Sequence, residues 1–231
     1  MAYGKAPVWV RLVRVYREKG PGGVWFGALS RVGYRRLVLL ERNLGEPVLP
    51  VAARADVEVR PLRRDDEAAF AALGQNDARV FRSRLEAGHQ CWGAWCSGDL
   101  RHVAWLGFRE VHVEYLNCRL LLDQGVAYVY RAFTQPAYRR LGLGPATQEK
   151  CLQAQRERGC RLVLAAVLPD NPWAYPPWLR VGYRRVAVVR ALGAGRWRRI
   201  VVTPGERPGA RTGWRFDRPG SDVRPAPDGR A

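Results

Sequence analysis

The chain has 231 residues, of which 47 % are hydrophobic, and this fits one ordinary domain with extensions or two small domains. It contains no run of about 18 apolar residues, and the apolar stretch over 7–16 is interrupted by Arg11 and Arg14 without a small-residue cleavage site after it, so we expect no membrane insertion, no signal peptide and a cytoplasmic location. The formal net charge of +18 is dispersed, mostly as arginine, and predicts a surface that attracts polyanionic small molecules rather than a dedicated nucleic-acid role.

The five cysteines form no pattern that indicates a metal site or a disulfide framework. No C-x-x-C pair occurs, and the three histidines stand at no zinc-binding spacing from the cysteines. An odd number of cysteines without a signal peptide also argues against disulfides. We therefore expect no metal, and we interpret each cysteine as a small buried hydrophobe.

Residues 1–55 are interpreted as an N-terminal extension. The apolar pattern over 8–19 predicts a helix, which the segment Gly20-Pro21-Gly22-Gly23 ends. The short apolar run over 36–41 predicts a strand. A basic amphipathic helix can lie on a membrane surface, but we favour one that packs against the main domain.

Residues 56–203 alternate between strand and helix patterns and are interpreted as the main domain. The predicted elements are a strand over 57–62, helices over 65–73 and 78–87, a hairpin of 91–96 and 102–108, a strand over 126–134, a helix over 145–158, a strand over 161–168, a short helix, and strands over 184–192 and 197–203. Residues 204–231 are rich in Pro, Gly, Arg and Asp, which predicts a mostly disordered tail whose only aromatic residues are Trp214 and Phe216.

A glycine-bearing turn, Arg139-Arg140-Leu141-Gly142-Leu143-Gly144, lies between the strand expected over 126–134 and the helix that follows it. The first backbone N–H groups of a helix lack intrahelical acceptors and lie at the positive end of the helix dipole. Gly142 and Gly144 would leave those donors accessible, and Arg139 and Arg140 add positive charge. These residues alone support a phosphate site and an ordinary strand-to-helix turn equally well.

The turn resembles motif A of the GNAT superfamily of N-acetyltransferases, R/Q-x-x-G-x-G/A. Arg139 takes its first place, Gly142 its first glycine and Gly144 its last position, and the preceding Pro136-x-Tyr138 is also usual for that family. This resemblance identifies the expected anion as the pyrophosphate of acetyl-CoA.

A second match lies downstream, where Asn171-Pro-Trp-Ala174 and Gly182-Tyr183 resemble the family's N-x-x-A segment and the glycine-aromatic pair that ends its last helix. The resemblance covers roughly residues 57–203 and is more specific in the second half. It implies an α+β fold with a mixed, mostly antiparallel central sheet flanked by helices, together with an N-terminal extension over 1–55, a GNAT-like acyltransferase domain over 56–203 and a disordered C-terminal tail over 204–231.

In this family the fourth and fifth strands of the sheet splay apart at a bulge, and the pantetheine arm of acetyl-CoA inserts there like another strand. The resemblance therefore implies an acetyl-CoA site without a metal. Asn171 would contact the pantetheine or shape the cleft, and it can equally cap the helix that begins at Pro172. The residues assigned to acetyl-CoA are Ala132, Phe133, Thr134, Arg139, Arg140, Leu141, Gly142, Leu143, Gly144 and Asn171.

Direct acyl transfer requires that the amine loses a proton and that the leaving thiolate gains one. Family members often supply the second proton from a tyrosine seven residues after the asparagine. That position holds Trp178 here, and an indole N–H is not a usable acid. Tyr130, on the expected strand, and Tyr175 are the alternative candidates for the acid.

Candidates for the base precede that strand, where Glu110, His112 and Glu114 alternate along an extended segment. Glu114 is the first choice because partial burial beside Tyr115 could raise its pKa. A solvated edge explains the same alternation.

The resemblance favours an acyl-CoA-dependent N-acyltransferase that uses acetyl-CoA and transfers the acyl group directly to a primary amine on a small molecule or a protein. Trp173 and Trp178 could wall an apolar acceptor pocket, although most tryptophans belong to the core. A non-catalytic GNAT-fold module that binds CoA or a protein is the alternative, and a basic RNA-associated protein is a further one. A homodimer is compatible with the sequence.

Overall fold

The computed structural model describes residues 16, 21, 29, 33–48, 50–51, 56–74, 77–169, 175–193, 199–205 and 213–217. The helix expected over 8–19 lies largely outside these residues, and the two expected site residues Asn171 and Trp173 lie outside them as well. The elements are β1 Arg35–Asn43, β2 Glu58–Pro61, η1 Arg64–Asp66, α2 Glu67–Ala72, α3 Ala78–Glu86, β3 Gln90–Cys96, β4 Asp99–Phe108, β5 Glu110–Val113, β6 Cys118–Leu122, β7 Val126–Thr134, η2 Pro136–Tyr138, α4 Leu143–Glu157, β8 Leu162–Val167, α5 Tyr175–Arg180, β9 Arg184–Leu192, β10 Arg199–Pro204 and β11 Trp214–Asp217.

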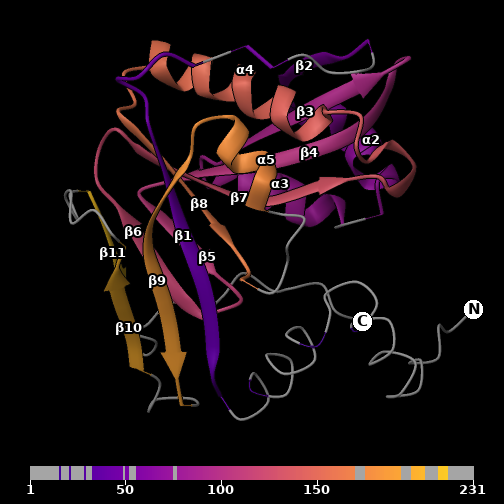
Figure 1. The fold of residues 1–231 in the computed structure, drawn as a ribbon. Coiled ribbons are helices and arrows are strands. Elements are labelled where there is room, and N and C mark those ends of the chain that lie inside the picture. The colour runs from indigo at the N-terminus through magenta and orange to yellow at the C-terminus, as the bar shows by residue number, and fades with distance from the viewer. Residues whose placement is uncertain are drawn as a thin grey trace, which may run out of the picture.

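The strands form two sheets (Figure 1). The larger has eight strands in the order β10-β9-β1-β8-β7-β4-β3-β2, and the smaller has three in the order β11-β6-β5. Every described strand pair is antiparallel except β7 and β8, which are parallel. This mixed, mostly antiparallel sheet with flanking helices confirms the expected α+β fold class.

Strand β1 lies inside the larger sheet, between β9 and β8, although its residues belong to the expected N-terminal extension. Leu39 pairs with Ala166 on one side and with Ala187 on the other. Its apolar run from Leu37 to Leu40 is buried, as is typical of a central strand that is covered on both faces. The extension therefore contributes a strand that holds β8 and β9 together.

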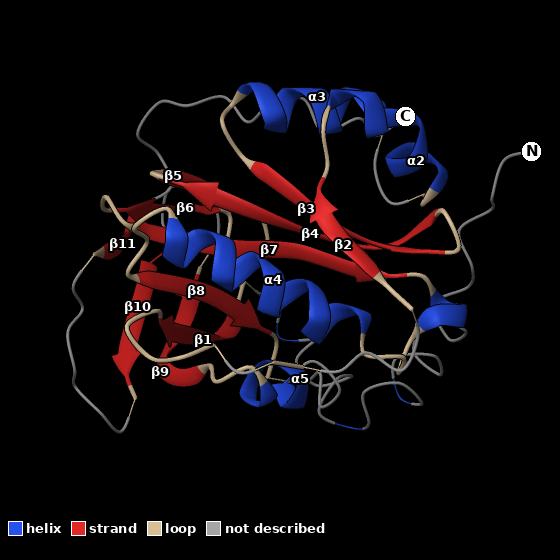
Figure 2. Ribbon diagram, turned by 90° about the horizontal axis from the view of Figure 1, so that it is seen from above, coloured by secondary structure: helices blue, strands red, loops and turns tan. Residues whose placement is uncertain are grey.

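Helices cover both faces of the larger sheet. Alternate residues of a strand point to opposite faces, so neighbouring residues pack against different helices. On one face, Val129 of β7 packs with Leu152 of α4, and Figure 2 shows α4 lying along β7 and β8. On the other face, Trp105 of β4 packs edge-on against Phe70 of α2 and Phe81 of α3. None of the described helices is long and apolar enough to cross a membrane.

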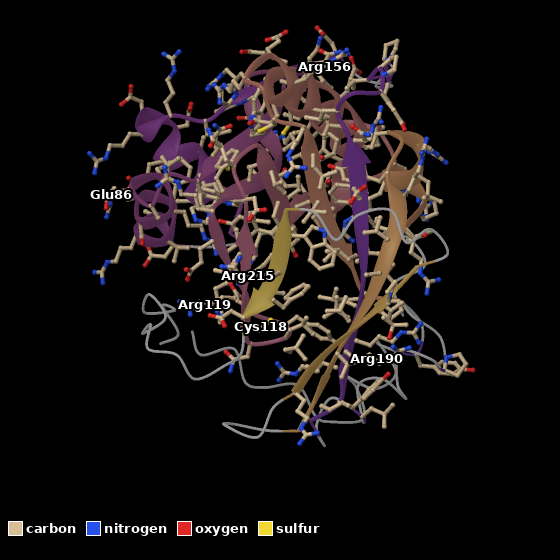
Figure 3. All side chains as sticks on the ribbon, turned by 90° about the vertical axis from the view of Figure 1, so that its left-hand side faces the viewer. Glu86, Cys118, Arg119, Arg156, Arg190 and Arg215 are labelled. Carbon is tan, nitrogen blue, oxygen red and sulfur yellow. The ribbon has the colours of Figure 1, made fainter. Side chains whose placement is uncertain are left out.

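The three-stranded sheet covers the face of the larger sheet that points away from α4. Leu120 of β6 and Trp214 of β11 are buried in one cluster with Tyr128 of β7, whose side chain points opposite to that of its neighbour Val129. Trp214 and Phe216, the aromatic residues of the expected tail, pack edge-on to each other at 5.9 Å. Figure 3 labels Cys118 and Arg119 on β6 and Arg215 on β11.

Candidate functional site

Strands β7 and β8 stop pairing partway along their length. Their parallel pairing runs from Val126 and Leu162 to Val129 and Ala165, although β7 continues to Thr134. From Tyr130 onwards, the backbone groups on this edge of β7 have no partner on β8. Such an open edge can accept an extended chain as an additional strand.

A bulge in β7 lies where the pairing stops. On the side of β4, Trp105 is opposite Tyr130 and Val103 is opposite Phe133, so two residues of β7 face the single residue between Val103 and Trp105. Arg131, inside the bulge, has a φ of 50°. A bulge bends its strand, which explains why β7 leaves β8 at this point. The splayed strands expected from the resemblance are therefore present in this chain.

The expected phosphate turn connects β7 to α4 and leaves the start of the helix without a cap. Gly142 is the N-cap residue, with a φ of 84° and no side-chain cap hydrogen bond. Its carbonyl accepts the N–H of Ala146 at 3.0 Å, so the first intrahelical bond begins there. The preceding backbone N–H groups of the helix start are the ones that lack intrahelical acceptors. This end of α4 is therefore suited to bind an anion.

Gly144 lies in the first turn of α4, where the protein's own packing does not require a glycine. A Cβ there would come no closer than 3.5 Å to a neighbouring atom, Cε1 of His102, which is an ordinary contact. A glycine inside a helix costs about 1 kcal/mol relative to alanine. The absence of a side chain at Gly144 is explained if another molecule approaches the backbone there.

His102 of β4 lies beside this helix start and is a residue that the sequence analysis missed. It is 3 % exposed, its Nδ1 lies 2.7 Å from Oγ1 of Thr134, and its Nε2 has no hydrogen-bond partner in the described part of the chain. Burial lowers the pKa of His102 to about 4, so the imidazole is neutral near pH 7. Its contact fixes Thr134, one of the residues assigned to acetyl-CoA.

Arg139 also contacts Thr134, because its Nε donates to the Thr134 carbonyl at 3.4 Å. Thr134 therefore links the end of β7 to the phosphate turn. Ala132, on the same stretch of β7, is exposed. The structure thus brings the expected pantetheine and pyrophosphate residues together along one continuous edge.

Tyr130 is the first residue of β7 beyond the pairing with β8, and its hydroxyl lies 2.6 Å from Nδ1 of His89. The two rings are edge-on, and Tyr128 stacks parallel to Tyr130 at 6.2 Å. Burial raises the pKa of Tyr130, whereas burial and the charge of Arg84 lower the pKa of His89. Both groups are therefore neutral near pH 7, and a hydrogen bond joins the hydroxyl to the imidazole.

His89 is held between α3 and β4. Its N–H donates to the carbonyl of Arg84 at 3.0 Å, one turn after the helix ends. A Cβ at Gly107 would clash with Cγ2 of Val111 and come within 3.1 Å of Cε1 of His89, so the glycine leaves room for both side chains. No local pattern distinguishes a lone histidine after a helix, so His89 was not predicted as a site residue.

The structure contradicts the expected pKa of Glu114. Burial alone would raise this pKa, but the hydrogen bond and charge of Arg131, with Arg84 and His112, lower it below its ordinary value. Glu114 lies in the turn after β5 and forms an ion pair with Arg131. An ionised and paired carboxylate of low pKa is a weak base.

Glu110 and His112 point outward from β5, while Val111 and Val113 between them are buried. Glu110 pairs with Arg119 at 3.5 Å. This arrangement fits the solvated edge that was the alternative explanation for their alternation.

Tyr175 and Trp178 of α5 are half-buried and pack against the cluster on the α4 face of the larger sheet. Trp178 lies edge-on to Tyr183 at 4.9 Å. Tyr130 packs instead with the clusters on the opposite face. The structure therefore separates Tyr130 from the packing of Tyr175 and Trp178.

These features define a sheet that splays at a bulge beside an uncapped helix start, which is the architecture expected of acetyl-CoA-dependent acyltransferases. The model of the family described as Acetyltransferase (GNAT) family matches residues 58–183, more than half of the chain. The chain belongs to the GNAT acetyltransferase family. No protein with curated annotation matches its sequence.

Solved structures share the fold. A GNAT-family acetyltransferase from Novosphingobium aromaticivorans is 18 % identical with a TM-score of 0.50, and the match covers 70 % of this chain and 66 % of that one. A GCN5-related N-acetyltransferase from Kribbella flavida is 23 % identical with a TM-score of 0.51, covering 76 % and 65 %. Another from Sphaerobacter thermophilus is 14 % identical with a TM-score of 0.50, covering 89 % and 60 %. The chain thus spans less than two thirds of the length of each.

Proposed function

We propose that the protein is an acyl-CoA-dependent N-acyltransferase that uses acetyl-CoA and transfers the acyl group directly to a primary amine. The observation that carries this proposal is the uncapped start of α4, with the bare Gly144, at the end of the open edge of β7. A pyrophosphate on the helix and an extended pantetheine along β7 would use both features together.

The proposed cofactor contacts follow the chain from β7 into α4. Ala132, Phe133 and Thr134 would offer backbone groups to the pantetheine. The backbone from Leu141 to Gly144 would bind the pyrophosphate, with Arg139 and Arg140 supplying positive charge. Asn171 stays a prediction for the pantetheine end.

In the proposed reaction, the amine nitrogen attacks the thioester carbonyl carbon, the carbon–sulfur bond breaks, and the amide and CoA form. One proton leaves the amine and one joins the thiolate. Tyr130 is the acid we favour, because its neutral hydroxyl lies where β7 and β8 part, and His89 can exchange a proton with it. Tyr175 is disfavoured as the acid by its packing in the cluster on the α4 face. Glu114 is disfavoured as the base by its pairing with Arg131.

Calorimetric titration with acetyl-CoA and a thiol-release assay over a panel of primary amines test this function. We expect heat of binding in the first experiment and amine-dependent release of CoA in the second. A chain that binds no acetyl-CoA would overturn the proposal.

A non-catalytic CoA-binding module is the second candidate. Trp178 at the usual position of the acid and the low pKa of Glu114 favour it. Tight binding of acetyl-CoA without thiol release from any amine would establish this module in place of the enzyme.

A further inference from the structure

Arg84 of α3 carries a largely buried guanidinium that makes no side-chain hydrogen bond within the described part of the chain. Its side chain is 15 % exposed, and its Nη1 is buried without a partner. The guanidinium lies over the rings of Trp105 and Tyr130, at 5.3 and 5.4 Å from their centroids. Burying a charge without hydrogen bonds is costly, so such donors are usually matched by an acceptor.

The nearest carboxylate does not supply that acceptor. Oε1 of Glu114 lies 3.8 Å from Nη2 of Arg84, which is beyond hydrogen-bond distance, while Oε2 of Glu114 is bonded to Arg131. Glu114 is therefore hydrogen-bonded to Arg131 and leaves the Arg84 guanidinium without a hydrogen-bonded carboxylate among the described residues. His89 adds no charge near pH 7, because burial and Arg84 lower its pKa.

Arg84 lies where the acceptor would meet the thioester in the proposed reaction. Tyr130, under the guanidinium of Arg84, is the residue at which β7 leaves β8. Arginine is suited to bind a carboxylate through two parallel hydrogen bonds. The amine nitrogen and the carboxyl carbon of an α-amino acid are about 2.5 Å apart, so a carboxylate on Arg84 would keep the amine close to Tyr130.

We propose that the acceptor is an amine that carries a carboxylate, such as an amino acid, and that Arg84 binds this carboxylate. The proposal rests on the N-acyltransferase function and names the class of its acceptor. It also excludes polyamines and aminoglycosides as preferred acceptors, because their additional positive charges would face Arg84.

The test compares L-amino acids with the corresponding amino-acid amides, which keep the amine and the side chain but lack the carboxylate. For the preferred amino acid, the kcat/KM of the wild-type enzyme should be at least about tenfold higher than for the corresponding amide. Arg84→Met keeps the apolar stem over the two rings but removes the charge. It should reduce kcat/KM for the acid to that for the amide, while the Kd of acetyl-CoA stays unchanged.

Arg84→Lys and Arg79→Met are the matched variants. The lysine keeps the charge without the paired donors, so it should retain part of the preference. Arg79 is exposed on the same helix, and its replacement should leave the preference intact. Thermal unfolding shows whether each variant is folded.

Two results would overturn the carboxylate-bearing acceptor while leaving the acyltransferase function in place. One is that amides, polyamines or aminoglycosides are acetylated with the same kcat/KM as amino acids. The other is that Arg84→Met leaves the ratio of kcat/KM for acid and amide unchanged. If no amine releases thiol, the proposed function fails. The same preference is then measured as the Kd of amino acid and amide for the CoA-bound protein, and equal values would overturn the carboxylate site.

Discussion

The hydroxyl of Tyr130 lies 2.6 Å from Nδ1 of His89, and this pair joins β7, at the point where it parts from β8, to the segment that follows α3. The two residues are 41 positions apart in the chain. Their contact places the proposed proton-transfer pair beside the open edge on which acetyl-CoA is proposed to bind.

Tyr130→Phe should lower kcat by about 100-fold, the lower range of the effect of losing a general acid. The Kd of acetyl-CoA should stay within about threefold, because the proposed cofactor contacts are backbone groups further along β7 and at α4. Thiol-release assays measure kcat, and calorimetry measures the Kd of acetyl-CoA.

Tyr128→Phe is the control for that variant, since Tyr128 is stacked on Tyr130 but packs in the cluster beneath the three-stranded sheet. If both variants keep wild-type kcat, Tyr130 is not the acid.

The pH dependence of the rate should show the low pKa of His89. Burial and Arg84 lower this pKa, so His89 stays neutral, and active, down to values below the ordinary histidine pKa of about 6.5. The ratio of kcat/KM for wild type to that for His89→Gln cancels the ionisation of the amine. It should be constant from pH 8 to about 6.5 and fall at lower pH. A ratio that declines already between pH 8 and about 6.5 would contradict this role.

His102 should make the protein sensitive to acid. Its folded-state pKa of about 4 lies below the unfolded value of about 6.5, so the unfolded chain binds the proton first as the pH falls. The free energy of unfolding should therefore decrease between pH 6.5 and 4, by roughly 3 kcal/mol from this residue. Denaturant unfolding across this range measures the loss.

His102→Gln should remove most of that decrease, whereas His112→Gln, at an exposed position of β5, should keep it. Equal pH profiles for wild type and His102→Gln would show that His102 titrates normally.

Much of the fold was predictable because its strands carry strong local patterns. The strands expected over 126–134 and 184–192 agree with β7 and β9 residue for residue. Their β-branched and aromatic residues form runs that are bounded by turn residues. The phosphate turn was also recognisable, since Gly142 has the positive φ that favours glycine at a helix cap.

Long-range arrangement was not predictable in this way. The insertion of β1 between β9 and β8 depends on partners more than 100 residues away, and periodicity carries no information on them. The four residues of β11 pair with β6 inside a segment whose composition indicates a tail. Arg84, His89 and His102 are single polar residues whose roles arise only when strands and helices bring them to the splayed edge.

The most direct test of the account is the affinity of Gly144→Glu for acetyl-CoA. The new carboxylate would occupy the proposed position of the pyrophosphate. The helical backbone has room for a side chain at this position. Replacing a glycine inside a helix also stabilises the helix by up to about 1 kcal/mol. Arg156→Gln, an exposed residue at the other end of α4 (Figure 3), makes the same change in net charge. We predict that Gly144→Glu unfolds no earlier than wild type and weakens acetyl-CoA binding at least about 100-fold, with Arg156→Gln near wild type. A folded Gly144→Glu protein with wild-type affinity would contradict the account.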